Sequence, residues 1–146
     1  MTSRRRRGQE TGQITGMLVI FAVCLLLAIS AVTNIAASYL RRQAATSLAD
    51  GAALSASDGA AAAGVYGSLD DTHVTIDEAA ATAAVEAYLQ QVGAHTTYPG
   101  LEADVIVDGP AVFVYLSMPF ELPVSLPGAP GTTTIHASGS AVMPIY

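Results

Sequence analysis

Residues 11–40 form a run of thirty residues without one charged side chain. From Met17 to Val32, ten side chains are Leu, Ile, Val or Phe. Each of these favours the bilayer by roughly 0.3–0.6 kcal/mol, or about 3–6 kcal/mol together. As a helix, residues 14–37 are roughly 36 Å long, which is enough to cross a hydrocarbon core of about 30 Å. The run therefore predicts a transmembrane helix over residues 14–37.

Basic residues flank this helix unequally, with four on its N-terminal side and two on its C-terminal side. They are Arg4, Arg5, Arg6 and Arg7, followed by Arg41 and Arg42. Because the more basic flank of a transmembrane helix stays in the cytoplasm, the first four arginines are the predicted topology signal. We expect a single-pass protein of the bacterial cell membrane, with residues 1–13 as a basic cytoplasmic tail and the C-terminal domain outside.

A cleavable secretory signal is the alternative reading of the same segment. A signal needs a basic start, an apolar centre and a cut site of small residues, and Ala36-Ala37-Ser38 would serve as that site. Cleavage near residue 37 would release a secreted, small, acidic binding domain. The apolar stretch is longer than a usual signal core, however, and no helix breaker precedes the site. We therefore expect the helix to be retained.

The part of the chain after the helix is strongly acidic. Residues 43–146 hold eleven Asp or Glu residues and no Lys or Arg. A surface without fixed positive charge repels phosphate groups, so nucleic acid is excluded as an expected partner.

The sequence shows no pattern of residues that would support catalysis or metal binding. His73, His95 and His136 are far apart and lack metal-ligand spacing. Cys24 lies in the transmembrane segment, where a small apolar role suits it. We expect no enzyme activity, no catalytic, metal or cofactor site, and no small-molecule substrate.

An Ala-rich segment, residues 38–58, follows the transmembrane helix and contains no helix breaker. It is expected to continue the membrane helix outward as a helical stalk. Small residues recur four positions apart at Ala45, Ala49, Ala53 and Ser57. Such spacing lets another helix approach closely, but a face packed on the protein's own sheet explains it equally well.

The segment from residue 12 to residue 57 resembles the N-terminal part of the TadE/TadG-like family of Tad/Flp pilus-assembly proteins. The matching positions are Gly12, Gln13, Asn34, Tyr39, Arg42, Ala49, Asp50, Ala52, Ala53 and Leu54. Two positions depart from the family pattern, since Thr33-Asn34 replaces its Val-Asp and Gly51 stands where Ala is usual. The resemblance implies a membrane-anchored structural component of a pilus-assembly or secretion apparatus. Its partners would be the lipid bilayer and other membrane helices, met through helix packing and an acidic exterior domain.

A polar amide at the depth of Asn34 is costly unless it is paired. Asn34, with Ala31 and Ser38 on neighbouring turns, is therefore a candidate contact to a second membrane helix. The alternative is that Asn34 lies at the headgroup level and meets water.

Residues 59–73 are expected to be a linker, and residues 74–146 a small exterior α+β domain. Thr75 and Glu78 have the spacing of a capping box, which predicts a helix that runs to about Gln91 and ends at Gly93. Its expected apolar stripe consists of Ala81, Ala84, Val85, Tyr88, Leu89 and Val92.

Three strands are expected after this helix. Residues 101–108 alternate apolar and polar side chains, which is typical of a half-buried strand. Residues 111–118 are almost continuously apolar, which favours a central strand covered on both faces, and the prolines from Pro119 onward favour an irregular stretch. Residues 132–142 present Ile135, Ala137, Gly139 and Ala141 on one face, small enough for a helix to lie close. The expected fold class is α+β, with a long N-terminal transmembrane helix and Ala-rich stalk, a second helix and a small antiparallel sheet of about three strands, in a pilin-like arrangement.

Overall fold

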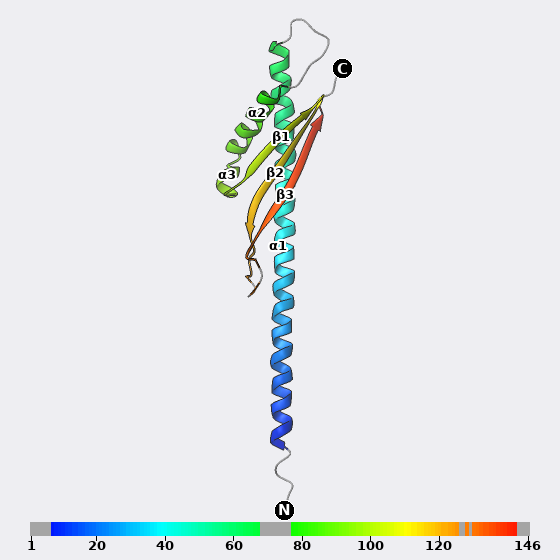
Figure 1. Ribbon diagram of the computed structural model, residues 1–146, viewed down its shortest axis with the longest axis vertical. Coiled ribbons are helices and arrows are strands. Elements are labelled where there is room, and N and C mark those ends of the chain that lie inside the picture. Colours follow the sequence, from blue (N-terminus) through cyan, green and yellow to red (C-terminus); the bar gives the residue numbers. More distant parts are fainter. Residues whose placement is uncertain (1–6, 68–76, 126–127, 129, 143–146) are drawn as a thin grey trace, which may run out of the picture.

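The computed structural model describes residues 7–67, 77–125, 128 and 130–142, with side chains described from Gln13 to Ala62 in the first helix. The chain is α+β, with a long helix α1 (Arg7–Gly67), two shorter helices and three strands. The remaining elements are α2 (Glu78–Gln91), α3 (Ala94–Thr97), β1 (Glu102–Asp108), β2 (Ala111–Glu121) and β3 (Thr132–Val142). Figure 1 shows α1 as a rod along the whole molecule, with the other elements beside its C-terminal half.

Helix α1 contains 61 residues and is therefore roughly 90 Å long. It has no proline, and the commonest residue of its C-terminal half is Ala, the strongest helix former. The expected helical continuation from the apolar segment through residues 38–58 is confirmed, since α1 is unbroken over this range. The linker expected from residue 59 is wrong for residues 59–67, which remain helical, because the alanines there outweigh Gly59 and Gly64. Residues 68–73 of that linker lie outside the described residues.

The three strands form one antiparallel sheet in the order β1-β2-β3. Asp108 pairs with Ala111 across a tight turn, in which Gly109 adopts a positive φ of 57° that favours glycine. The first and third strands match the sequence prediction to within one residue at each end. β2 is the central strand, as its apolar run predicted.

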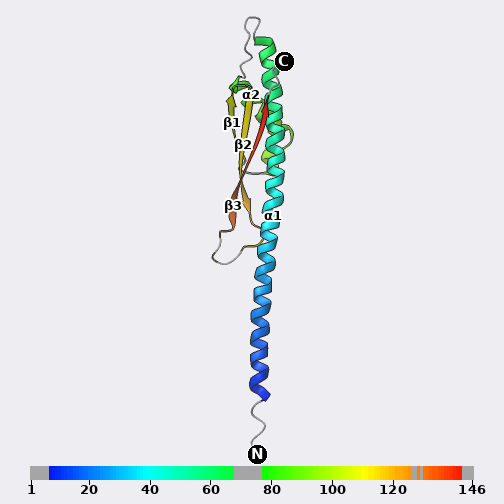
Figure 2. The same cartoon turned by 90° about the vertical axis from the view of Figure 1, so that its right-hand side faces the viewer.

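Only one face of the sheet is covered by helices. In β2, Val112, Val114, Leu116 and Met118 are buried, whereas Tyr115 between them is 45% exposed. The predicted coverage of β2 on both faces is therefore wrong. The apolar run indicated two buried faces because Phe113 and Tyr115 are also apolar, but these two side chains lie on the open face. Figure 2 shows the sheet on one side of α1.

β2 continues through Pro119 to Glu121, where the sequence predicted an irregular stretch. Proline lacks the N–H that a central strand donates, but β1 begins only at Glu102, which pairs with Ser117. Beyond that point β2 pairs only with β3, so Pro119 occupies an edge position, where proline is tolerated.

Helix α2 begins at a different cap from the one predicted. Asp77 is the N-cap, and its carboxylate accepts a hydrogen bond of 3.0 Å from the backbone N–H of Ala79. Thr75, the other half of the predicted capping box, lies outside the described residues. The helix ends at Gln91 as predicted, and Gly93 follows with a left-handed φ of 65°.

The predicted apolar stripe of α2 is only partly buried. Ala81, Val85 and Leu89 are buried, and Ala84 and Tyr88 are partly exposed. Val92 is 46% exposed, because it lies past the helix end and no longer follows the helical stripe.

The core lies between α1, α2 and the inner face of the sheet. On the α1 side it is built from fully buried alanines, and opposite them stand larger side chains such as Leu89, Leu116 and Met118. Burying each of these larger side chains contributes about 1.5–3 kcal/mol. Alanines on α1 allow the sheet to approach the helix backbone, and a Cβ atom at Gly139 of β3 would overlap the backbone of Ala49 and Asp50. The prediction that this strand face lies close to a helix is confirmed.

Candidate functional site

The apolar segment of α1 before Asn34 projects beyond the sheet domain. The large apolar side chains of α1 from Ile14 to Leu40 are all about half exposed or more, and none of its most apolar stretch is buried. Within the described residues, this is the one helix long and apolar enough to cross a membrane. Cys24 lies in the middle of this stretch and is exposed. Arg4, Arg5 and Arg6 of the predicted topology signal lie outside the described residues, and Arg7 is the first residue of α1.

Asn34 joins this apolar segment to the sheet domain. Its Nδ2 donates a hydrogen bond of 2.9 Å to the carbonyl oxygen of Val124, and its Oδ1 accepts one of 3.0 Å from the Val124 N–H. Val124 lies in the β2–β3 loop, residues 122–131, which the hydrogen bond from the Leu122 N–H to the Gly131 carbonyl closes. The amide of Asn34 therefore has both of its partners in the backbone of the same chain.

The sequence leaves two partners open for Asn34: a second membrane helix, contacted through Ala31, Asn34 and Ser38, or water. The structure gives its amide a third partner, the backbone of Val124. The contact of this helix face with another helix stays a prediction. Ala31 remains exposed and Ser38 is partly buried on the same face of α1.

A second contact between α1 and the sheet domain lies two helical turns after Asn34, at Arg41. The Arg41 guanidinium lies over the Tyr98 ring, 4.7 Å from its centroid, and 5.5 Å from the centroid of the Phe120 ring. Tyr98 follows α3, and Phe120 lies near the end of β2. A cation between two aromatic faces is attracted by both ring quadrupoles. Arg41 thus binds α1 to two elements of the domain at the point where the apolar segment ends.

The family-motif positions divide into an inward set and an outward set. Ala49, Ala52 and Ala53 are fully buried, which explains the small residues there by packing within the chain. Ala45, Ala49, Ala53 and Ser57 are likewise all buried in this domain. Their spacing is therefore explained by packing within the protein and not by the approach of another helix. Gln13 is exposed, and Gly12 lies within α1.

The outward set lies on the side of α1 that the domain leaves open. Tyr39 is 69% exposed, Leu54 is 59% exposed, and Arg42 and Asp50 are also exposed. Five exposed residues three or four positions apart form what we call the outward stripe: Tyr39, Gln43, Thr46, Asp50 and Leu54. Such spacing places them on one helix face, and a shallow hollow at the lower end of this face is lined by Tyr39, Arg42, Gln43, Thr46 and Ser47.

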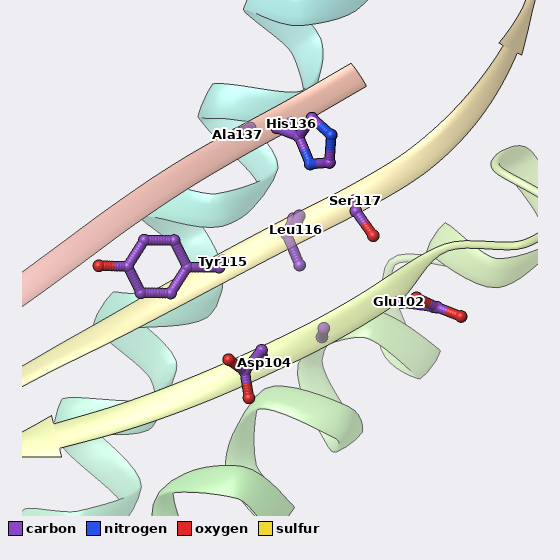
Figure 3. Close-up of a pocket in the computed structure, with 8 residues that line it drawn as sticks. Glu102, Asp104, Tyr115, Leu116, Ser117, His136 and Ala137 are labelled. Carbon is purple, nitrogen blue, oxygen red and sulfur yellow. The ribbon is translucent and has the colours of Figure 1, made fainter. Parts of the chain in front are cut away.

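The open face of the sheet carries a shallow groove of about 390 Å³. Figure 3 shows Tyr115, Ser117 and His136 on the side turned away from the α1 ribbon, with Glu102 and Asp104 along β1. Glu102, Ser117 and His136 are direct neighbours across the three strands. Within the described residues, no three His, Cys, Asp or Glu side chains come together in a geometry that could hold a metal ion.

His95 does not line this groove. His95 forms an ion pair of 3.2 Å with Glu86, and both side chains are close to half exposed. His73 lies outside the described residues.

Sequence reasoning missed the partners of Asn34 and Arg41. Val124 contributes only backbone atoms, and it is separated from Asn34 by ninety positions. Tyr98 and Phe120 carry no local pattern that would pair them with an arginine on the first helix. The only available signal was the presence of a polar amide inside an apolar helix, which indicated that a partner exists but not which one.

Comparisons with family models, with curated proteins and with solved structures found no match for this chain.

Proposed function

We propose that the chain is a membrane-anchored structural component of a Tad/Flp-like pilus-assembly or secretion apparatus. One observation carries the proposal: a single helix holds an unburied apolar segment at one end and the core of an α+β domain at the other. In a chain built in this way, one helix links the bilayer rigidly to the exterior domain. Its described residues bring no metal-binding cluster together.

The division of the motif residues supports the same proposal. Ala49, Ala52 and Ala53 pack inside the domain, whereas Tyr39, Asp50 and Leu54 of the outward stripe are exposed among the described residues. Burial of the Leu54 and Tyr39 side chains against a partner would be favourable. The outward stripe is therefore the surface through which other helices of the apparatus bind.

The secreted alternative is less well supported, because the predicted cut lies inside a structural unit. Cleavage near residue 37 would separate Asn34 from Val124 and remove both hydrogen bonds between them. It would also cut α1 in the middle of a helix that continues to Gly67. If the helix is retained, Asn34 and Val124 stay in the same protein and both hydrogen bonds between them are kept.

Deletion of the chain from its own host tests the proposed function. We expect loss of assembled pili or of secretion through the apparatus, restored by the full chain. Leu54→Asp, in the outward stripe, should fail to restore assembly while the protein is still found in the membrane. Ser138→Asp, on the open face of the sheet, is the matched control and should restore it. Normal pili and secretion in the deletion strain would exclude the proposed function.

A further inference from the structure

The position of Asn34 in the predicted span gives the depth of the β2–β3 loop relative to the membrane. The predicted span of roughly 36 Å exceeds a hydrocarbon core of about 30 Å, so about 3 Å of helix lies in the headgroups at each end. Asn34 lies three residues, or roughly 4.5 Å, before the end of that span. It is therefore at the boundary between hydrocarbon and headgroups. Because both polar backbone atoms of Val124 bind the Asn34 amide, Val124 lies at the same depth.

The packing of β3 on α1 gives the same level independently. Gly139 lies against Ala49. Thr132, the first residue of β3, is seven residues before Gly139 and so roughly 23 Å away along the strand. Asn34 is fifteen residues before Ala49 and so roughly 22 Å away along the helix. Figures 1 and 2 both show β3 running alongside α1, so the start of β3 and the loop before it reach the level of Asn34.

The loop lacks charged residues, as expected for a segment at the boundary between hydrocarbon and headgroups. Glu121 is the last charged residue of an otherwise acidic domain, and from Leu122 onward the chain has no Asp, Glu, Lys or Arg. Leu122 and Val124 are partly exposed, and Pro123 and Ser125 are exposed. The exposed carboxylate of Glu121 belongs in the hydrated headgroup layer, which is about 5–7 Å thick on each side of the bilayer.

The residues just above the loop also suit a lipid surface. Arg41 and the exposed Arg42 follow the end of the predicted span, and guanidinium groups bind phosphate oxygens in a planar, bidentate geometry. Tyr39 lies close to these arginines along the chain. The rings of Tyr98 and Phe120 are in contact with Arg41. Aromatic rings of Tyr are enriched at this level of a membrane.

We propose that residues 122–125 of the β2–β3 loop insert into the headgroup layer of the outer leaflet, where Arg42 binds phospholipid phosphate. The proposal rests on the proposed membrane anchoring of α1. Its consequence is that the domain contacts the bilayer at two places, the helix and the loop, and so has a fixed orientation on the membrane surface.

Fluorescence of single Trp variants tests this proposal, since the chain has no Trp of its own. The full chain is reconstituted in vesicles of phosphatidylglycerol and phosphatidylcholine, with bromine on acyl carbons close to the headgroup as the quencher. Ser125→Trp reports on the loop. Ser138→Trp, on the exposed outer face of β3, is the matched control for a Trp outside the membrane. Leu25→Trp, near the middle of the predicted span, is the control for insertion of α1. Its quencher is bromine near the ends of the acyl chains, because a quencher close to the headgroup lies too far from the centre of the bilayer to reach it.

We expect the bromolipid to lower the fluorescence of Ser125→Trp by at least about half, as for a residue at the membrane interface, and to leave Ser138→Trp unchanged. In Ser125→Trp protein that also carries Asn34→Ala, the quenching should fall, because the tie to Val124 is lost. Quenching of Leu25→Trp without quenching of Ser125→Trp would overturn the loop proposal and leave the anchor intact. Absence of quenching at Leu25→Trp would overturn both proposals.

Discussion

Gly139 shows how a single missing side chain sets the distance between the sheet and α1. A Cβ atom there would overlap backbone atoms of Ala49 and Asp50, and backbone cannot rotate away as a side chain end can. We expect Gly139→Ala to lower the free energy of unfolding by about 1–3 kcal/mol or more through overpacking, and Gly139→Leu to disrupt the domain. Thermal unfolding of the full chain in detergent micelles, followed by circular dichroism, measures the change.

Ser138 and Ser140 are the controls for Gly139, because they are adjacent in β3 and exposed on the opposite face. Ser138→Ala and Ser140→Ala should change the free energy of unfolding by no more than about 0.5 kcal/mol. Equal losses at Gly139 and Ser138 would mean that the faces of β3 are assigned the wrong way round.

Asn34 is the residue whose loss should separate the domain from the membrane segment. Asn34→Leu leaves the N–H and carbonyl of Val124 without their partners, and each unsatisfied group costs about 1–3 kcal/mol where water cannot replace the bond. We expect faster hydrogen exchange at the Val124 amide and a lower unfolding temperature. Thr33→Val is the control, because the Thr33 hydroxyl bonds only to Ile29 of its own helix. An unchanged rate of hydrogen exchange at the Val124 amide in Asn34→Leu would contradict the hydrogen bonds between Asn34 and Val124.

At the scale of elements, α1 and α2 are held together by a close approach at Gly59. A Cβ atom on Gly59 would lie 2.7 Å from the Cβ of Ala84 in α2. Gly59→Val should therefore force the helices apart at a cost of about 1–3 kcal/mol, which lowers the unfolding temperature by roughly 4–8 °C per kcal/mol in a domain of this size. Ala62→Val is the control, because Ala62 is exposed on the same helix.

A double-mutant cycle distinguishes this contact from a general effect on α1. If the two residues collide, Ala84→Gly should recover part of the stability lost in Gly59→Val, with a coupling of about 0.5 kcal/mol or more. Strictly additive effects of the two substitutions would show that Gly59 is needed for another reason.

The elements that sequence reasoning located well are those with a clear period or composition. β1 alternates apolar and polar residues, and β3 presents small residues on one face; both appear in the structure almost as predicted. Helix α1 was predicted as a continuous helix up to residue 58, where Asp58-Gly59 resembled a stop signal. The alanines that follow carry the helix onward to Gly67, because their helix propensity outweighs the cost of glycine, which is about 1 kcal/mol.

Features that depend on distant contacts were not accessible from the sequence. The apolar run of β2 does not say how many of its faces are covered, because exposed Tyr115 and buried Val114 look alike in such a run. The sequence predicts a strand break at Pro119, because the start of β1 opposite Ser117, which leaves Pro119 at an edge, is a property of the folded sheet. The pairing of Asn34 with Val124 and of Arg41 with Tyr98 likewise arises only when the domain folds back along α1.

At the scale of the whole molecule, the two ties make the membrane segment and the domain one structural body. Asn34 and Arg41 contact the domain two turns apart, on the part of α1 where the apolar segment ends. A hinge at this point would have to break two hydrogen bonds and a cation–aromatic contact. In the proposed membrane anchoring, the orientation of α1 therefore also fixes the orientation of the acidic domain.

The orientation of the chain across the membrane depends on the charges that flank the apolar segment. Arg4–Arg7 precede the apolar segment, and only Arg41 and Arg42 follow it, so the C-terminus should lie outside the cytoplasmic membrane. An alkaline phosphatase domain fused to the C-terminus, which is active only outside the cytoplasm, should be active in intact cells. Replacing all four N-terminal arginines with Gln should lower this activity, because the remaining arginines favour the opposite orientation.

Arg42→Gln is the matched control, because it removes a positive charge from the other flank. Arg42 has an exposed side chain, whereas Arg41 is held between two aromatic rings and would change the domain as well. Arg42→Gln should keep the phosphatase activity at least as high as in the parent, since the charge difference across the membrane then increases. A parent fusion that is present at full length in the cells but inactive would place the acidic domain in the cytoplasm, and the proposed exterior role of the outward stripe would fail with it.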